Sequence, residues 1–310
     1  MMKKKTDELF CYYFYEWVRQ YKEGTVRDIT LMKWHSTATW LRKIVPDLLL
    51  EDLDRREYQR ILNEYAKVHE KATMTDFHHM VKAAILDAVD DDLIAKNPTR
   101  KVTIKGKKPR PKKRKYLSEA EVERLIDALE LKIDEISYDW MILFALKTGM
   151  RLEELLGLTV EDFNIINMTV TVNKSFDYKY TQDFAQTKNR SSMRTIKMDW
   201  KTAMQFKTLL EGKDPQGRVF DFKKKFYAST INDHLRRRCQ QAQVPEITMH
   251  CLRHTHASIL MYKGVSTQSI SKRLGHATTD ITQRVYLHLI EEMESKDEKK
   301  VMAALMEMDY

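Results

Sequence analysis

The second half of this 310-residue chain contains three stretches rich in side chains that can hold and cleave a phosphodiester. They are TGMRLEELLGL (residues 148–158), ITMHCLRHTHASIL (247–260) and GVSTQSISKRLGHATTDITQRVYLHL (264–289). The first two supply Arg151 and Arg253. A guanidinium is planar and permanently charged, so two can clamp both non-bridging oxygens of one phosphate. Negative charge on those oxygens grows as phosphorus becomes five-coordinate, and preorganised cations then stabilise the transition state.

Each arginine also has a purely structural interpretation, as the partner of Glu153, of Glu154 or of a helix end. The occurrence of two such arginines in motifs of this kind favours the phosphate site. Glu154 follows Arg151 at a spacing of three residues, which places both on one side of a helix. We therefore expect Glu154 to orient an arginine from behind and not to contact the substrate.

The third stretch supplies Tyr286, a candidate nucleophile. Its neighbours Val285 and Leu287 are apolar, a pattern that is otherwise typical of a core tyrosine. A phenol has a pKa of about 10, so forming the phenolate at pH 7 costs roughly 4 kcal/mol, which a base or a cationic pocket must offset. His250 is a candidate for taking the proton, and His276 for hydrogen-bonding a non-bridging oxygen or the phenol.

Three histidines, at positions 250, 254 and 256, raise the alternative of a metal site. His250 and His254 are four residues apart, but no glutamate lies between them as in H-E-x-x-H. Arg253 lies among these histidines and would repel a cation. We therefore expect no catalytic metal.

The elements that must position these residues begin with a helical first domain over residues 1–97. An apolar stripe at three- and four-residue steps predicts the face of a first helix. Further helices are expected over 30–44, 53–67 and 75–93, the last with a capping start at Thr73 and Asp76 and a stop at Asn97-Pro98. The stripe consists of Phe10, Phe14, Trp17, Val18 and Tyr21.

A basic segment separates this domain from the next. Residues 100–115 (RKVTIKGKKPRPKKRK) contain ten cations, no acids, two prolines and one glycine. Such a run predicts an extended, exposed connector over 98–116. It is either a solvated linker or localisation tag, or a strap that tracks DNA phosphates by releasing counterions. The ten cations are Arg100, Lys101, Lys105, Lys107, Lys108, Arg110, Lys112, Lys113, Arg114 and Lys115.

The second domain is predicted to span residues 117–290. Ser118 and Glu121 have capping-box spacing, and a buried helix over 137–148 should end at Gly149. Strand-like segments at 168–172 and 193–198 flank a polar stretch and predict a hairpin or small antiparallel sheet. Helices follow over 200–211, over 230–243 and from residue 250. The domain therefore reads as α+β, and the chain as mainly α.

The composition agrees with a nucleic-acid partner without requiring one. Lys and Arg outnumber Asp and Glu by 54 to 45, a formal charge of +9. No apolar run approaches the roughly 20 residues of a membrane span, and no signal-type apolar core follows the first lysines. Three cysteines without C-x-x-C spacing argue against a disulfide framework and structural zinc; they are Cys11, Cys239 and Cys251. The expected location is a reducing cytoplasm.

Taken together, the motifs resemble those of the phage integrase family of tyrosine recombinases. That family's signature is Arg, then Lys in a β-hairpin, then His-x-x-Arg, then His or Trp, then Tyr. The neighbours fit as well: Thr-Gly, Leu-Arg-His-Thr and Leu-Gly-His stand where the family has them. The resemblance covers residues 117–290 strongly and the first domain and linker more loosely. The matching residues are Arg151, Lys188, His250, Arg253, His276 and Tyr286.

The assignment of the lysine is the least constrained part of this match. The resemblance implies that Lys188 reaches the minor groove and protonates the leaving 5′-oxygen, which an ammonium can do at pH 7. Lys188 could equally be a charge at the tip of a hairpin. Lys174, Lys179 and Arg190 are nearby competitors for the role.

The resemblance also implies an architecture and a reaction. The first domain would be an all-helical core-binding domain of SAM-like fold, and the second the recombinase catalytic domain. Together they would close on duplex DNA at a recombination site. The tyrosine would form a 3′-phosphotyrosine, so neither ATP nor a metal or other cofactor is needed. Two rounds of exchange through a Holliday junction, by a homo-tetramer, would integrate or excise a mobile element of a phage or conjugative transposon. An accessory DNA-bending protein or excisionase is a further expected partner, in the bacterial cytoplasm at the nucleoid.

Several alternatives stay open. A chromosome-dimer resolvase of the Xer type shares the catalytic residues, a type IB topoisomerase shares the chemistry without a tetramer, and a DNA-binding regulator would have a degenerate site. Many related integrases carry a small arm-binding domain at the amino end; we expect none within this sequence, which would then be a natural short form or a shortened form of such an integrase. The tail over residues 291–310 would pack on its own domain or dock on a neighbouring protomer.

Overall fold

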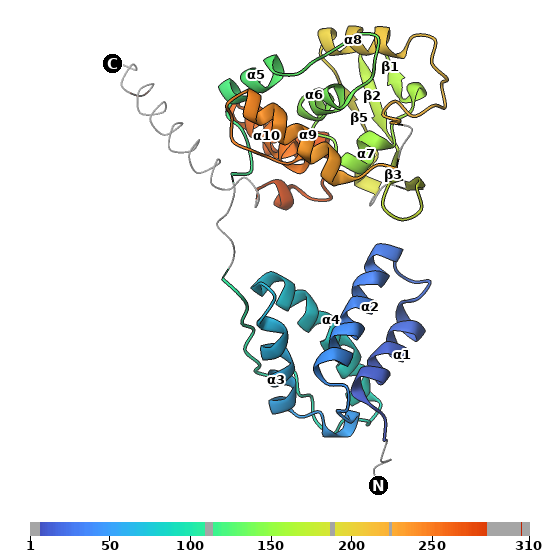
Figure 1. Cartoon of the computed structure of the whole chain (residues 1–310), viewed down its shortest axis with the longest axis vertical. Helices are drawn as coiled ribbons and strands as arrows, with labels where there is room; N and C mark the ends of the chain where they lie inside the picture. Colours follow the sequence, from blue (N-terminus) through green and yellow to red (C-terminus); the bar gives the residue numbers. More distant parts are fainter. Residues whose placement is uncertain (1–6, 109–113, 187–189, 223–224, 284–304, 306–310) are drawn as a thin grey trace. The chain divides into compact units, whose positions relative to one another are not determined.

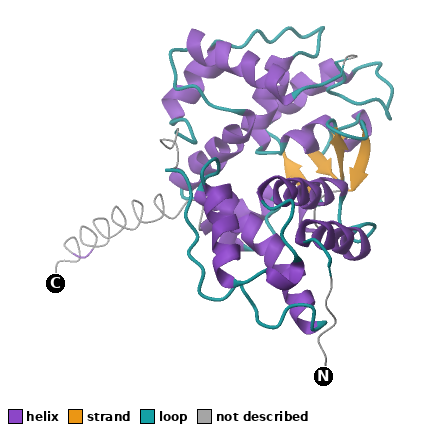
Figure 2. Cartoon of the chain, turned by 60° about the horizontal axis from the view of Figure 1, so that its bottom comes forward, coloured by secondary structure: helices purple, strands orange, loops and turns teal. Residues whose placement is uncertain are grey.

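A computed structural model describes residues 7–108, 114–186, 190–222, 225–283 and 305. The chain divides between Lys112 and Lys113 into two compact units (Figure 1). Most of the described residues lie in helices, and the few strands gather in one small region (Figure 2). No helix among these residues is both long and apolar enough to cross a bilayer.

The first unit is helical, as the sequence predicts. Its elements are α1 (Phe10–Lys22), α2 (Asp28–Ile44), the short 3-10 helix η1 (Leu50–Asp52), α3 (Arg55–Ala66) and α4 (Lys71–Asp90). The apolar stripe of α1 is buried except for Tyr21, which is 46% exposed and lies against the ring of Trp17. The capping start predicted at Thr73 is wrong, because α4 already begins at Lys71 and its N-cap is Glu70.

Part of the basic segment is bound to the first unit, contrary to the exposed connector expected from its charge. Val102 and Ile104 pack on the unit's core. The side chain of Gln59 accepts from the backbone N–H of Thr103 (2.8 Å) and donates to its carbonyl (2.9 Å). Farther along, the N–H of Lys107 donates to the carbonyl of His69. The apolar residues between the cations decide this packing, and the cations stay exposed.

The helices of the second unit are α5 (Glu119–Asp127), α6 (Tyr138–Thr148), α7 (Leu152–Leu156), α8 (Trp200–Leu210), α9 (Ala228–Gln241), α10 (Met249–Tyr262) and α11 (Thr267–Leu274). They pack around one large core and one smaller apolar cluster between α10 and α11. The capping box of Ser118 and Glu121 is present, as predicted. Nearly every residue of α6 is buried, and the helix ends at Gly149 in the left-handed conformation, as predicted.

Two small antiparallel sheets complete this unit. β1 (Phe163–Asn164), β2 (Thr169–Val172) and β5 (Arg194–Lys197) form one sheet, in which β2 pairs with β5, as predicted. β3 (Lys174–Asp177) and β4 (Asp183–Gln186) form a separate hairpin that the sequence did not reveal, because its strands are short and polar. Lys188 follows this hairpin and lies outside the described residues.

A buried ionic cluster links α6 to α9. Asp139 is 2% exposed and accepts from Nε (3.0 Å) and Nη2 (2.6 Å) of Arg238 and from Nε2 of His234 (2.7 Å). Arg238 also reaches Glu130, whose side chain is 69% exposed. Burial alone would raise the pKa of Asp139, but the hydrogen bonds from His234 and Arg238 lower it below its ordinary value.

Removing this buried charge should destabilise the second unit. We expect Asp139→Asn to lower the free energy of unfolding by about 3 kcal/mol, because it leaves Arg238 buried without its main partner. Glu130→Gln is the matched control and should cost much less, since the side chain of Glu130 is exposed to solvent. The stabilisation by Asp139 is complete above its ordinary pKa of 3.8 and is lost on acidification below it. Denaturant unfolding at pH 7 measures both variants, and equal losses would contradict the assignment.

Candidate active site

Arg151 is positioned by a buried carboxylate. It is the N-cap of α7, and its Nη1 and backbone N–H donate to Oε1 (2.8 Å) and Oε2 (2.9 Å) of Glu154. Arg194 on β5 donates to the same two oxygens at 3.2 and 2.9 Å. Burial would raise the pKa of Glu154, but the hydrogen bonds and charge of Arg194, together with Arg151, lower it. Glu154 therefore orients two arginines as an anion, while Arg151 stays partly exposed.

Arg253 connects three parts of the second unit. It is 4% exposed on α10, and its Nη1 donates to the carbonyl of Gly149 (2.7 Å) and its Nη2 to that of Leu274 (2.8 Å). Gly149 has a φ of +68°, and a Cβ there would lie 2.7 Å from Cδ2 of His256. The Thr-Gly that precedes Arg151 is thus explained by a left-handed helix end with no room for a side chain.

His256 is a structural residue. Its Nδ1 donates to the carbonyl of Leu146 (2.7 Å), and its Nε2 accepts from Nε of Arg273 (2.9 Å). Burial and the nearby charge of Arg273 lower its pKa to about 3. Arg273 in turn donates to the carbonyls of Lys197 and Lys147. Within the described residues, no group of three or more His, Cys, Asp and Glu side chains is arranged to hold a metal ion.

The other histidines of the motifs are held neutral. Burial, then the charges of Arg253 and Arg151, lower the pKa of His250 below its ordinary value. The same causes lower the pKa of His276 to about 4, and its Nδ1 lies 2.7 Å from Oγ1 of Thr282. Burial lowers the pKa of His254 to about 4, and its ring lies edge-on to that of His250. A neutral imidazole can accept a proton or a hydrogen bond, as the predicted roles require.

Arg151, His250 and Arg253 line one cavity of about 390 Å³. The neutral His276 lines a second cavity of about 690 Å³ together with four cations, Arg194, Lys197, Lys272 and Arg273. The charges of Arg253 and Arg151 nonetheless act on His276. Of the predicted catalytic residues, Lys188 and Tyr286 lie outside the described residues.

Sequence reasoning missed Arg194 and Arg273. Both are partly buried cations that bind backbone carbonyls, Arg194 also Glu154 and Arg273 also His256, and neither stands in the family signature. Arg194 lies on the same face of β5 as the buried Ile196, and the residue pattern predicted a strand there but did not identify Glu154 as the partner of Arg194. Arg273 precedes Leu-Gly-His in the last turn of α11, where the sequence alone suggests a charged residue exposed to solvent.

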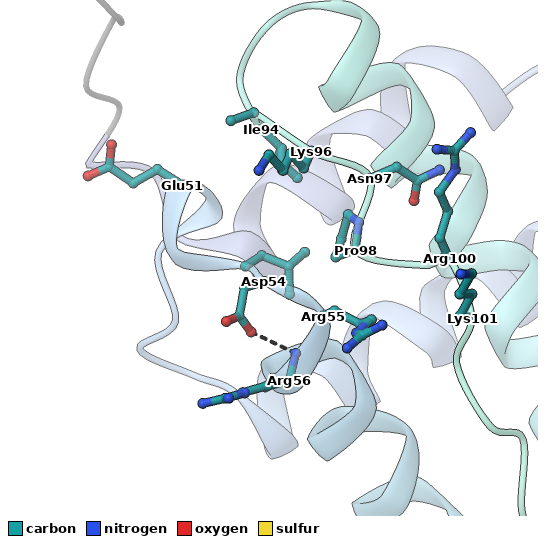
Figure 3. Close-up of a pocket in the computed structure, with 12 residues that line it drawn as sticks. Glu51, Asp54, Arg55, Arg56, Ile94, Lys96, Asn97, Pro98, Arg100 and Lys101 are labelled. Carbon is teal, nitrogen blue, oxygen red and sulfur yellow. Dashed lines mark hydrogen bonds between the residues drawn. The ribbon is translucent and has the colours of Figure 1, made fainter.

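The basic segment lies partly in the first unit. Arg100 and Lys101 line a cavity of about 700 Å³ together with Arg55, Arg56 and Lys96 (Figure 3). Lys105, Lys107 and Lys108 are exposed. In the second unit, Arg114 pairs with Glu121 (2.8 Å), and the charge of Lys115 acts on His250. Arg110, Lys112 and Lys113 lie outside the described residues.

The mainly helical fold, the small antiparallel sheet and the pair of arginines in one cavity are the features expected of a recombinase catalytic domain. The model of the phage integrase family matches residues 115–293, more than half of the chain. The chain therefore belongs to the phage integrase family and is a tyrosine recombinase, an enzyme that breaks and rejoins DNA strands.

Known proteins resemble the chain beyond the catalytic unit. The integrase of Staphylococcus phage L54a is 29% identical over 287 residues, which cover 82% of this chain and 81% of that protein. A solved structure of the Tn1549 transposon integrase in complex with a circular intermediate DNA matches with a TM-score of 0.73 at 19% identity, covering 93% of this chain and 99% of that one. A lambda integrase tetramer bound to a Holliday junction matches with a TM-score of 0.63 at 16% identity, covering 88% and 78%. These structural likenesses show the fold.

A methyl group at Gly149 should disturb the site more than the same change elsewhere. We expect Gly149→Ala to cost about 3 kcal/mol, because it adds a clash with His256 to left-handed strain. Gly212→Ala is the matched control: φ is +70° there, and no described atom lies within 4 Å of the added Cβ. It should cost only about 1 kcal/mol. Denaturant unfolding compares the two, and equal costs would refute the packing argument.

The titration of His276 tests the cationic environment. In the DNA-free protein we expect the ring to have a pKa of about 4, below the ordinary value of 6.5 for histidine, so the side chain is neutral at pH 7. Proton NMR measures the midpoint, with His276→Asn to assign the resonance. Arg151→Gln should move the midpoint upward, since it removes one of the repelling charges. A midpoint near 6.5 in the unmodified protein would contradict the structure.

Proposed function

We propose that the chain is the integrase of a phage or conjugative transposon, and that Arg151 and Arg253, with His250 beside them, hold the phosphate at which it cuts DNA. The single observation that supports this most is their shared cavity, in which the two arginines are fixed by buried partners. Similarity to a phage integrase over four-fifths of both chains supports the mobile-element assignment. Tyr286 is the proposed nucleophile and His276 a hydrogen-bonding partner of the phosphate.

The proposed reaction exchanges one ester for another. The phenol oxygen of Tyr286 attacks phosphorus and gives its proton to His250, which is neutral and able to accept it. The bond from phosphorus to the 5′-oxygen breaks, and Lys188 protonates that oxygen. The 3′-phosphate stays on the tyrosine until a 5′-hydroxyl from a partner strand attacks, which restores the DNA backbone. The arginine pair stabilises the charge that develops on the non-bridging oxygens in both steps.

The substrate and assembly follow from the same assignment. The proposed partner is duplex DNA carrying recombination sites, bound by a homo-tetramer that proceeds through a Holliday junction. The solved lambda integrase tetramer on a Holliday junction has a similar fold and supports this assembly. An accessory DNA-bending protein or excisionase is a further proposed partner, and the nucleoid the proposed place of action.

The basic segment is proposed to bind the DNA backbone. Its cations in the first unit are exposed, and hydrogen bonds to Gln59 and His69 fix the backbone that carries them. Binding to DNA would therefore cost less conformational entropy than the ordering of a free linker. Five of the proposed contacts, at Arg100, Lys101, Lys105, Lys107 and Lys108, lie there, and Arg114 and Lys115 begin the second unit. Arg110, Lys112 and Lys113 complete the proposed set.

A nicked suicide substrate carrying the recombination site tests the nucleophile. The unmodified chain should form a protease-sensitive species covalently linked to DNA, and Tyr286→Phe should form none, because the attacking oxygen is absent. Tyr12→Phe removes an exposed hydroxyl in the first unit and is the matched control; it should react normally. Denaturing gels measure the product. A covalent product from Tyr286→Phe would show that another residue attacks the phosphate.

A further inference from the structure

The cavity that contains the two candidate arginines receives a further cation from the β3–β4 hairpin. Tyr178 and Lys179, which follow β3 directly, line it together with Arg151, His250 and Arg253. The reaction proposed above gives Lys179 no part. Its position beside groups assigned to a phosphate raises the question of what it binds.

The backbone at Lys179 is held in one conformation. Four residue pairs join the strands, ending at Asp177 opposite Asp183. The carboxylate of Asp177 accepts from the N–H groups of Lys179 (3.0 Å) and Tyr180 (3.1 Å), and its carbonyl accepts from the N–H of Gln182 (2.8 Å). Tyr178 is buried, with its ring edge-on to Phe226 at 5.2 Å. The turn is therefore preorganised and does not need ordering when a ligand arrives.

The base of the hairpin is fixed to the helix that follows Arg151. A Cβ on Gly157 would lie 2.9 Å from the backbone of Ser175, so the end of α7 and β3 are in direct contact. Lys174 at the start of β3 forms an ion pair of 2.7 Å with the buried Asp162. Because α7 begins immediately after Arg151, the hairpin and this arginine belong to one packed body. The place of Lys179 in the cavity is thus set by the fold.

Lys179 forms only a weak ion pair with Glu153. Its Nζ lies 3.9 Å from Oε1 of Glu153, and the two side chains are 43% and 53% exposed. An exposed pair at this distance contributes little to stability, and a phosphate can replace the carboxylate. The ammonium of Lys179 also contacts Tyr178, with Nζ 5.3 Å from the ring centroid, and the lysine side chain stays 43% exposed.

We propose that Lys179 binds a DNA backbone phosphate that flanks the reacting one, and that it exchanges Glu153 for this phosphate when DNA enters the cavity. The proposal rests on the function proposed above, in which Arg151 and Arg253 hold the reacting phosphate. Lys179 is then a binding residue that fixes the register of the strand. Its contact is the same before and during the reaction, so it strengthens binding without changing the chemical step.

A salt titration tests the phosphate contact without the need for a recombination site. The full chain is titrated with a short duplex of mixed sequence at several salt concentrations. Lys179→Gln should weaken binding and reduce the slope of log K against log salt by about 1, the amount expected for one lost phosphate. Lys263→Gln is the matched control, because it also removes one cation from an exposed pair, with Glu119 at 2.8 Å. Equal slopes for the two variants would overturn the proposal.

Single-turnover cleavage of the nicked suicide substrate separates binding from chemistry. With protein in excess, Lys179→Gln should raise the half-saturating protein concentration about tenfold and leave the maximal rate within about twofold. Lys179→Arg should restore most of the binding. A large fall in the maximal rate would overturn the proposal, since Lys179 would then act on the reacting bonds. If the unmodified chain forms no covalent product, the proposed function is refuted. The salt titration then remains as the test of whether Lys179 contacts a DNA phosphate.

Discussion

The second unit depends on how one buried guanidinium is held. Arg253 leaves α10 and donates to the carbonyl that ends α6, at Gly149, and to the carbonyl of Leu274 at the end of α11. These carbonyls are left without helical partners, so the arginine satisfies groups that would otherwise be costly to bury. Arg151 follows two residues after Gly149, and His276 two residues after Leu274. The same interaction therefore fixes the helix ends that precede Arg151 and His276, two of the predicted catalytic residues.

The arginines gathered here repel one another. Glu154 offsets part of their charge, and the neighbouring histidines add none because they are neutral. Glu154 is buried, remains charged, and receives hydrogen bonds from Arg151 and Arg194. Burial and the neighbouring arginines keep His250 and His276 unprotonated at pH 7. The site therefore stays net positive, and the two neutral histidines add no further positive charge to that of the arginines. In the function proposed above, a phosphate entering this site meets preformed donors, and little reorganisation is needed as negative charge develops.

Local signals in the sequence were sufficient where the deciding interaction is itself local. The capping box at Ser118, the helix end at Gly149 and the pairing of β2 with β5 were all predictable. Long-range contacts decided the rest. Val102 and Ile104 pack on a distant core despite the charge around them, and Arg273 binds a histidine 17 positions earlier. The β3–β4 hairpin escaped prediction because its polar strands are held by turn hydrogen bonds and by α7, which composition does not encode.

The central claim is that Arg151 and Arg253 neutralise the non-bridging oxygens of one phosphate. This role is tested most directly by removing the negative charge of the substrate phosphate as well as a positive charge of the protein. Cleavage rates of the unmodified chain and of Arg151→Ala are compared on a normal suicide substrate and on one with a neutral methylphosphonate at the cut. Arg151 is partly exposed, so the variant should fold. On the normal phosphate we expect the variant to be slower by about 10²-fold or more. The difference should largely disappear on the methylphosphonate, and an equal deficit on both substrates would contradict the account.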